Sequence, residues 1–223
     1  MILPDFAQPV RTALVTGGSR GIGAVTALLL RERGFDVDIP SRAELDFSST
    51  ASVAQYAVGM WGTESPDALI FCHGNWYSAM PSEQSEADWL AQYRERVLGP
   101  IRLIESYLLG QVKPGCVVIV ASTRGFMGGV DTGPYSIACA AQIALMQGYA
   151  REWPGTRFNC ICPGLTDTSM GQAVLETGGA KPGSVPQDPR AVARAIADLV
   201  ESDANGKVVR VVDGVASEAT WSW

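Results

Sequence analysis

Short apolar runs and longer helical periodicities alternate along the chain from residue 13 to residue 214. Apolar runs bounded by polar or turn residues are typical of strands buried in a sheet, whereas apolar positions that recur every three or four residues indicate helices packed on it. The runs predict strands at 13–15, 35–39, 68–72, 115–120, 157–162 and 206–212. The segments between them predict helices at 24–33, 85–109, about 135–153 and 189–202.

Strands and helices in this order predict an α/β fold: a doubly wound parallel sheet of the Rossmann type, in three αβα layers. Length and composition predict that the chain folds as one domain. The 223 residues are 47% hydrophobic and 18% charged, which is enough for one sizeable core, and no linker divides them.

Charge and composition argue against several classes of partner. The net charge is −6 and no dense run of lysine and arginine occurs, so neither nucleic acid nor an anionic membrane is expected to bind. No apolar run could span a bilayer and no secretion signal is evident, so we expect a soluble, cytoplasmic protein. The five cysteines form no C-x-x-C pair and there is one histidine, so we expect reduced, buried thiols and no metal site.

The first strand leads into a glycine-rich turn, Thr16 to Gly23, and then into a helix that ends at Gly34. In a dinucleotide fold, Gly17 would let the chain reverse, Gly21 would let a pyrophosphate approach the backbone, and Gly23 would let helix and strand pack closely. The unpaired N–H groups at the start of the helix favour an anion. Glycine turns alone are weak evidence, because any strand–helix loop can be glycine-rich.

The spacing Thr-Gly-x-x-x-Gly-x-Gly, followed by further matches in order up to Gly214, resembles the short-chain dehydrogenase/reductase family. Cys72-His73-Gly74 stands where the family usually shows Asn-Ala-Gly, and the octet 163–170 resembles the loop over its nicotinamide. The resemblance implies cofactor-binding residues at Gly17, Ser19, Arg20, Gly21, Ile22, Gly23, Ser41, Arg42, Asp46, Cys72, Gly74, Cys139, Pro163, Gly164, Thr166 and Thr168.

The cofactor is expected to be NADP(H). NAD enzymes of this kind place an acidic residue after the second strand to hold the ribose 2′-hydroxyl, but here Ser41 and Arg42 occupy that place. A guanidinium binds a 2′-phosphate that a carboxylate would repel, and Arg20 adds a second cation. The alternative is a pair of solvated surface arginines.

Three further residues or segments have expected roles. Asp46 resembles the family's adenine-contacting residue, or alternatively caps a turn or helix. His73 is expected to be a loop residue rather than a base, since no partner is placed beside it by sequence. The polar, glycine-rich residues 170–186 are expected to form a mobile substrate lid.

The resemblance also implies a catalytic tyrosine that exchanges a proton while hydride moves between nicotinamide and a carbonyl carbon. Ser122 stands thirteen residues before Tyr135, the family's spacing, but the lysine expected four residues after the tyrosine is Cys139. Bringing a phenol from a pKa of about 10 to near 7 is worth roughly 4 kcal/mol and depends mainly on a close cation. Tyr135 is therefore expected to be a poor base that can still donate a hydrogen bond.

A second departure concerns the asparagine that completes the family's proton relay. Counting back from Gly99 puts Arg96 at that position. One hypothesis is that the Arg96 guanidinium reaches into the space left by the lysine and restores a cation beside Tyr135, which makes Arg96 a candidate catalytic residue. The alternative is an arginine on an exposed helix face.

Three functions remain open at this point. The leading one is an NADPH-dependent reductase of a small, cyclic or conjugated carbonyl, quinone or imine, because such acceptors tolerate the missing lysine. The second is a non-redox lyase resembling halohydrin dehalogenases, against which the intact glycine turn argues. The third is an NADP-binding protein without turnover that acts as a sensor or assembly partner.

We also expect a homodimer or homotetramer. The tail with Trp221 and Trp223 is expected to contact the lid or another subunit.

Overall fold

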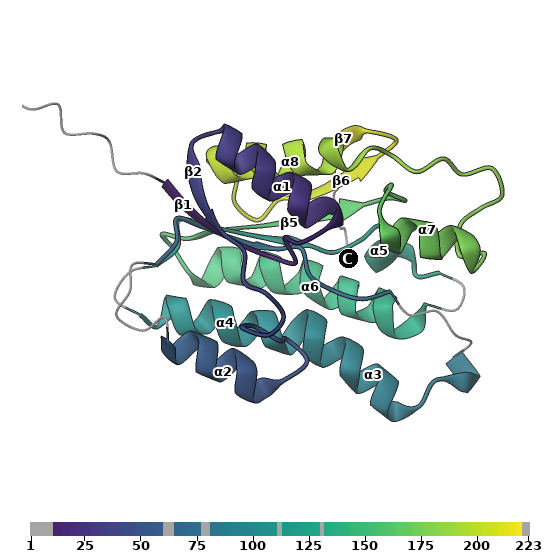
Figure 1. Cartoon of the computed structure of the whole chain (residues 1–223), viewed down its shortest axis with the longest axis horizontal. Helices are drawn as coiled ribbons and strands as arrows, with labels where there is room; N and C mark the ends of the chain where they lie inside the picture. Colours follow the sequence, from purple (N-terminus) through teal and green to yellow (C-terminus); the bar gives the residue numbers. More distant parts are fainter. Residues whose placement is uncertain (1–10, 60–64, 77–80, 111–112, 130–131, 220–223) are drawn as a thin grey trace, which may run out of the picture.

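The computed structural model describes residues 11–59, 65–76, 81–110, 113–129 and 132–219, so the predicted role of Trp221 and Trp223 lies outside it. A seven-stranded sheet in the order β2-β1-β3-β4-β5-β6-β7 lies between two layers of helices (Figure 1). The parallel strands are β1 (Arg11–Thr16), β2 (Phe35–Asp38), β3 (Ala68–Phe71), β4 (Cys116–Val120), β5 (Arg157–Pro163) and β6 (Val208–Val212). The predicted fold class is confirmed.

Helices cover both faces of the sheet. Figure 1 shows α1 (Gly21–Glu32) and α8 (Pro189–Glu201) on one face, and α2 (Thr50–Gly59), α4 (Gly99–Leu108) and α6 (Gly133–Glu152) on the other. Each face has its own buried apolar cluster, since strand side chains alternate between the faces. No described helix is both long and apolar enough to cross a membrane.

The predicted helix 85–109 is not one regular helix. It begins with α3 (Glu86–Tyr93), where Ser85 and Asp88 form a capping box, as their spacing predicts. A π-helical segment, Arg94–Leu98, then separates α3 from α4. Such wider turns change which side chains face inward, and apolar periodicity does not reveal them.

Several other elements were not predicted. They are β7 (Val215–Glu218), which pairs antiparallel with β6, the 3₁₀ turn Pro81–Glu83, α2, and the short helices α5 (Arg124–Met127) and α7 (Ser169–Glu176). The expected lid is therefore not a plain loop, because α7 forms its first half. Its mobility stays a prediction.

The glycine turn is packed tightly against the sheet. A Cβ atom on Gly23 would lie 2.3 Å from the carbonyl oxygen of Gly17. Gly17 has a φ of +68°, and a Cβ there would lie 2.7 Å from the backbone of His73, just after β3. These glycines therefore let α1 start close to two neighbouring strands, as predicted for Gly23.

We predict that Gly23→Ala lowers the free energy of unfolding by about 3 kcal/mol, because the added methyl group overlaps a backbone oxygen that has no room to move. The matched control is Gly148→Ala in α6, where an added Cβ meets nothing within 4 Å. That variant should gain roughly 0.5–1 kcal/mol from helix propensity. Urea unfolding of both variants measures the difference, and equal stabilities would contradict the prediction.

Candidate active site

A cavity of about 840 Å³ opens at the carboxyl ends of the parallel strands. Much of its wall is formed by the residues that follow β1, β2, β3, β4 and β5, and residues at the end of β6 complete one side. In the sheet, β2 lies on one side of β1 and β3 lies on the other. The strand order therefore reverses at β1, and the cavity lies at this point. Ligands bind at this point in open α/β sheets.

Most of the residues proposed from the sequence line this one cavity. They are Gly17, Ser19, Arg20, Gly21, Ile22, Ser41, Arg42, Asp46, Cys72, Gly74, Arg96, Ser122, Tyr135, Pro163, Gly164, Thr166 and Thr168. Gly23 and Cys139 are not part of its wall. Cys139 is fully buried within α6, so it does not reach the space available to a ligand, contrary to the expectation for its position.

The turn after β1 and the loop after β2 each carry a cationic side chain into solvent. Arg20, Ser41 and Arg42 are exposed, and Arg42 Nε lies 3.4 Å from Asp46 Oδ2. Glu44, which sequence reasoning missed, accepts a hydrogen bond from the Ser41 backbone N–H at 2.8 Å, and this bond lowers the pKa of its carboxyl. The loop is thus held in a turn, and the Arg42 guanidinium is exposed although it is paired with Asp46.

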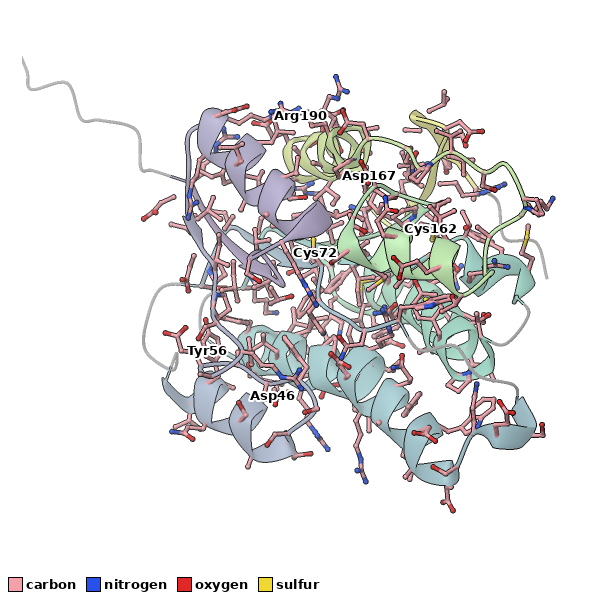
Figure 2. The ribbon with its side chains drawn as sticks, turned by 45° about the vertical axis from the view of Figure 1, so that its right-hand side comes forward. Asp46, Tyr56, Cys72, Cys162, Asp167 and Arg190 are labelled. Atoms are coloured by element: carbon pink, nitrogen blue, oxygen red, sulfur yellow. The ribbon has the colours of Figure 1, made fainter. Side chains whose placement is uncertain are left out.

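Asp46 holds a turn, as one of its two expected roles requires, and its contact with adenine stays a prediction. Its Oδ1 accepts hydrogen bonds from the backbone N–H and hydroxyl of Ser48, at 2.9 and 2.7 Å, which hold the turn before α2. The same residue lines the cavity, and Figure 2 shows it in the loop that precedes α2. The hydrogen bonds from Ser48 lower the pKa of the carboxyl, so Asp46 is ionised at neutral pH.

The loop after β5 is fixed by its own side chains. Thr168 caps α7, accepting a hydrogen bond from the Gly171 N–H at 3.1 Å, and Thr166 donates to the Gly164 carbonyl at 3.0 Å. Gln187, missed in the sequence, donates from Nε2 to Thr166 Oγ1 at 3.2 Å. These bonds hold the octet 163–170 against the cavity.

Arg96 lies beside Tyr135. Its guanidinium carbon is 4.4 Å from the centre of the Tyr135 ring, and the side chain is only 2% exposed. Nη2 donates to the Asn75 carbonyl at 2.9 Å, while Nε has no hydrogen-bond partner among the described residues. The alternative of an arginine on an exposed helix face is therefore wrong, and a cation–π contact replaces it.

Gly74 makes room for this guanidinium. A Cβ at position 74 would lie 2.5 Å from Arg96 Cζ. Trp76 also packs edge-on against Tyr135, with ring centroids 5.1 Å apart. Neither Asn75 nor Trp76 was singled out in the sequence, because contact between this loop and α6 depends on the fold.

The pKa of Tyr135 is nevertheless raised. Burial is the largest cause and the neighbouring Cys139 adds to it, whereas Arg96 and the Ser122 hydroxyl act in the opposite direction. Burial likewise raises the pKa of Cys139 to about 11, so the thiol is neutral. Tyr135 is therefore a protonated phenol at neutral pH, able to donate but not to accept a proton.

His73 is a structural residue, as expected. Its Nε2 lies 3.1 Å from the Glu95 carbonyl, which can only accept, so Nδ1 accepts from the Thr16 hydroxyl at 2.7 Å. The ring stacks on Phe47 with centroids 3.7 Å apart. Although the residue as a whole is only partly buried, its ring is enclosed, and this burial lowers the pKa to about 3.

His73 should therefore make the fold sensitive to acid. In the unfolded chain the histidine binds a proton once the pH falls below about 6.5, whereas the buried ring of the folded protein stays neutral. Acid therefore favours the unfolded state, and the free energy of unfolding decreases as the pH falls. We predict that the free energy of unfolding decreases by about 2 kcal/mol more between pH 7 and pH 5 in the natural protein than in His73→Gln. Urea unfolding at both pH values tests this, and identical pH dependences would refute it.

Comparison with known sequences identifies the family. The sequence model described as short chain dehydrogenase matches residues 43–178, more than half of the chain. The acetoacetyl-CoA reductase of Synechocystis sp. is 30% identical over 183 residues, covering 74% of this chain and 76% of that protein. The chain belongs to the short-chain dehydrogenase family.

Other members of the family agree with this assignment. The 2,3-dihydro-2,3-dihydroxybenzoate dehydrogenase of Escherichia coli is 30% identical over 182 residues, covering 74% of this chain and 73% of its own. A crystal structure of a small-chain dehydrogenase in complex with NADPH superposes with a TM-score of 0.78, at 22% identity, over 92% of this chain and 97% of that chain. This short-chain dehydrogenase therefore shares the family fold and belongs to a family of oxidoreductases.

Proposed function

We propose that this short-chain dehydrogenase is an NADPH-dependent reductase of a small, cyclic or conjugated carbonyl, quinone or imine. The proposal rests chiefly on one observation: Ser122 and a protonated Tyr135 line the same cavity as the glycine turn, with Arg96 packed on the tyrosine. The hydroxyl groups of Ser122 and Tyr135, with no strong base beside them, suit a reduction in which the substrate takes up a hydride and a proton. They do not suit the oxidation of an unactivated alcohol.

The cavity fits a phosphorylated dinucleotide. Gly17 and Gly21, with φ values of +68° and +56°, line this wall, and neither has a side chain that would keep a pyrophosphate away from the backbone. Arg20 and Arg42 are exposed at the same end, where they would hold a 2′-phosphate. Structural neighbours described as bound to NADPH support the choice. When bound, NADPH supplies the hydride.

The chain's own groups supply the proton and the orientation. The Tyr135 hydroxyl would donate to the acceptor oxygen or nitrogen, and the Ser122 hydroxyl would fix that atom's position. Arg96 would stabilise the phenolate left when the proton is transferred, since its charge lowers the pKa of Tyr135. The attraction between Arg96 and the phenolate is strongest in a buried site, because water there does not screen the two charges.

The direct test offers NADPH and a panel of quinones, cyclic imines and ketones to the protein. Loss of absorbance of the reduced nicotinamide with at least one of them is expected. No loss with any of them, despite tight NADPH binding, would instead support a protein that binds NADP without turnover. The raised pKa of Tyr135 and the cysteine at position 139 favour that second candidate.

For the cofactor, we predict that Arg20→Ala and Arg42→Ala each weaken NADPH binding about tenfold and leave NADH binding nearly unchanged, because each removes a charge-assisted contact to the 2′-phosphate. Calorimetric titration of both nucleotides measures the effect. Arg194→Ala, which removes an exposed arginine on α8, is the control. Equal losses for NADPH and NADH would overturn the predicted phosphate clamp.

For the proton, we predict that Arg96→Asn lowers kcat for reduction by about tenfold or more, whereas Arg94→Asn on the same π-helical segment has no effect, because Arg94 is exposed. Reduction by the natural protein should stay constant up to pH 9, since the pKa of Tyr135 lies above its usual value. Any alcohol oxidation should still be rising at pH 9. Unchanged kcat and pH profile in Arg96→Asn would exclude a role for Arg96.

A further inference from the structure

Charge is unevenly distributed around the cavity. The chain has a net charge of −6, but arginine and lysine outnumber acidic side chains on the cavity wall. The acidic residues there are Asp46, Glu95 and Asp213, and the basic ones are Arg20, Arg42, Arg96, Arg124, Lys181 and Arg210. The first three basic residues have roles in the proposed function. Arg124, Lys181 and Arg210 do not.

Arg210 has the most unusual environment of these three. It projects from β6 on the same face of the sheet as buried Val208, toward α5, where its guanidinium carbon lies 5.9 Å from the Phe126 ring. Its Nε is buried without a hydrogen-bond partner among the described residues. No carboxylate of the described residues forms an ion pair with it, although Asp213 lies nearby on the chain. A partly buried cation of this kind is costly unless an anion joins it.

Arg124 connects this region to the reaction centre. It begins α5 only two residues after Ser122, and its backbone N–H donates to Ser122 Oγ at 3.2 Å. Its guanidinium reaches across to the segment after α7, with Nη2 donating to the Gly179 carbonyl at 2.6 Å. Lys181 follows in the same segment and is exposed. Cations from α5, β6 and the expected lid therefore line the same cavity, and the one from α5 lies next to Ser122.

We propose that the substrate carries an anionic group, a carboxylate or a phosphate, which Arg210 and Arg124 bind while the reducible group lies at Ser122 and Tyr135. A guanidinium presents paired N–H donors that match either anion, and the short chain distance between Arg124 and Ser122 suits two ends of one small molecule. Lys181 adds an exposed positive charge to the same cavity. This inference rests on the proposed reductase function, whose substrate it specifies.

The binding experiment uses benzoate, inorganic phosphate and neutral benzamide as probes, titrated calorimetrically into the full chain saturated with NADPH. Benzoate or phosphate should bind and benzamide should not, and the tighter of the two anions identifies the preferred group. Arg210→Gln should weaken anion binding about tenfold or more without changing NADPH affinity. Arg190→Gln is the control, because Arg190, labelled in Figure 2, lies at the start of α8. It is not among the residues that line the cavity.

Turnover gives an independent measurement. The matched substrates are 4-oxocyclohexanecarboxylate and its methyl ester, and kcat/KM should be at least tenfold higher for the acid. Arg210→Gln should abolish that preference mainly through KM. If Arg210→Gln does not fold, Arg210→Lys serves instead, keeping the charge but losing the paired donors, and should retain only part of the preference.

The outcomes separate this inference from the proposed function. Benzamide binding as tightly as benzoate, or unchanged anion affinity in both Arg210→Gln and Arg124→Gln, overturns the anion site even if ketones are reduced. Equal kcat/KM for acid and ester also overturns it. If NADPH does not bind at all, the reductase proposal fails. The same anion titrations without nucleotide then decide whether the site exists.

Discussion

The fold depends on how closely three backbone segments approach one another at the reversal of strand order. The turn after β1 can touch the end of β3 only because Gly17 has no side chain, and α1 can start against that turn only because Gly23 has none. His73 holds the chain after β3 in place. Its ring accepts a hydrogen bond from the Thr16 hydroxyl in β1 and donates one to the Glu95 carbonyl. The cavity is therefore bordered by backbone whose position is determined before any ligand arrives.

The reaction centre shows two physical effects in opposition. Arg96 brings a positive charge against Tyr135, as a lysine does elsewhere in the family, but the same enclosure removes the water that would stabilise a phenolate. Burial is the larger effect, so the phenol keeps its proton. Gly74 and Arg96 depend on each other, because any larger residue at 74 would occupy the space of the guanidinium. A cation is thus present without a base being formed.

The sequence predicted the parallel strands of the sheet well, since strands buried on both faces leave unbroken apolar runs, and it also predicted the glycine turn and the helix start at Ser85. It could not predict elements defined by few residues, such as α5 and β7, whose hydrogen bonds come from tertiary neighbours. Family spacing left two alternatives for Arg96, a cation beside Tyr135 or an arginine on an exposed helix face. The sequence could not decide between them, because the burial of Arg96 depends on the contact between α6 and the loop after β3. Trp76 and Arg210 carry no local signal at all.

The π-helical segment Arg94–Leu98 determines which way Arg96 points. A wide turn of this type accommodates one extra residue within an otherwise regular helix. Removing one residue there would restore α-helical pairing and rotate the two flanking parts by about 100° relative to each other. Arg96 would then point elsewhere, while the apolar stripe of α4 would have to lose its register with the sheet. The buried position of Arg96 beside Tyr135 therefore depends on the wide turn of the helix as well as on the arginine itself.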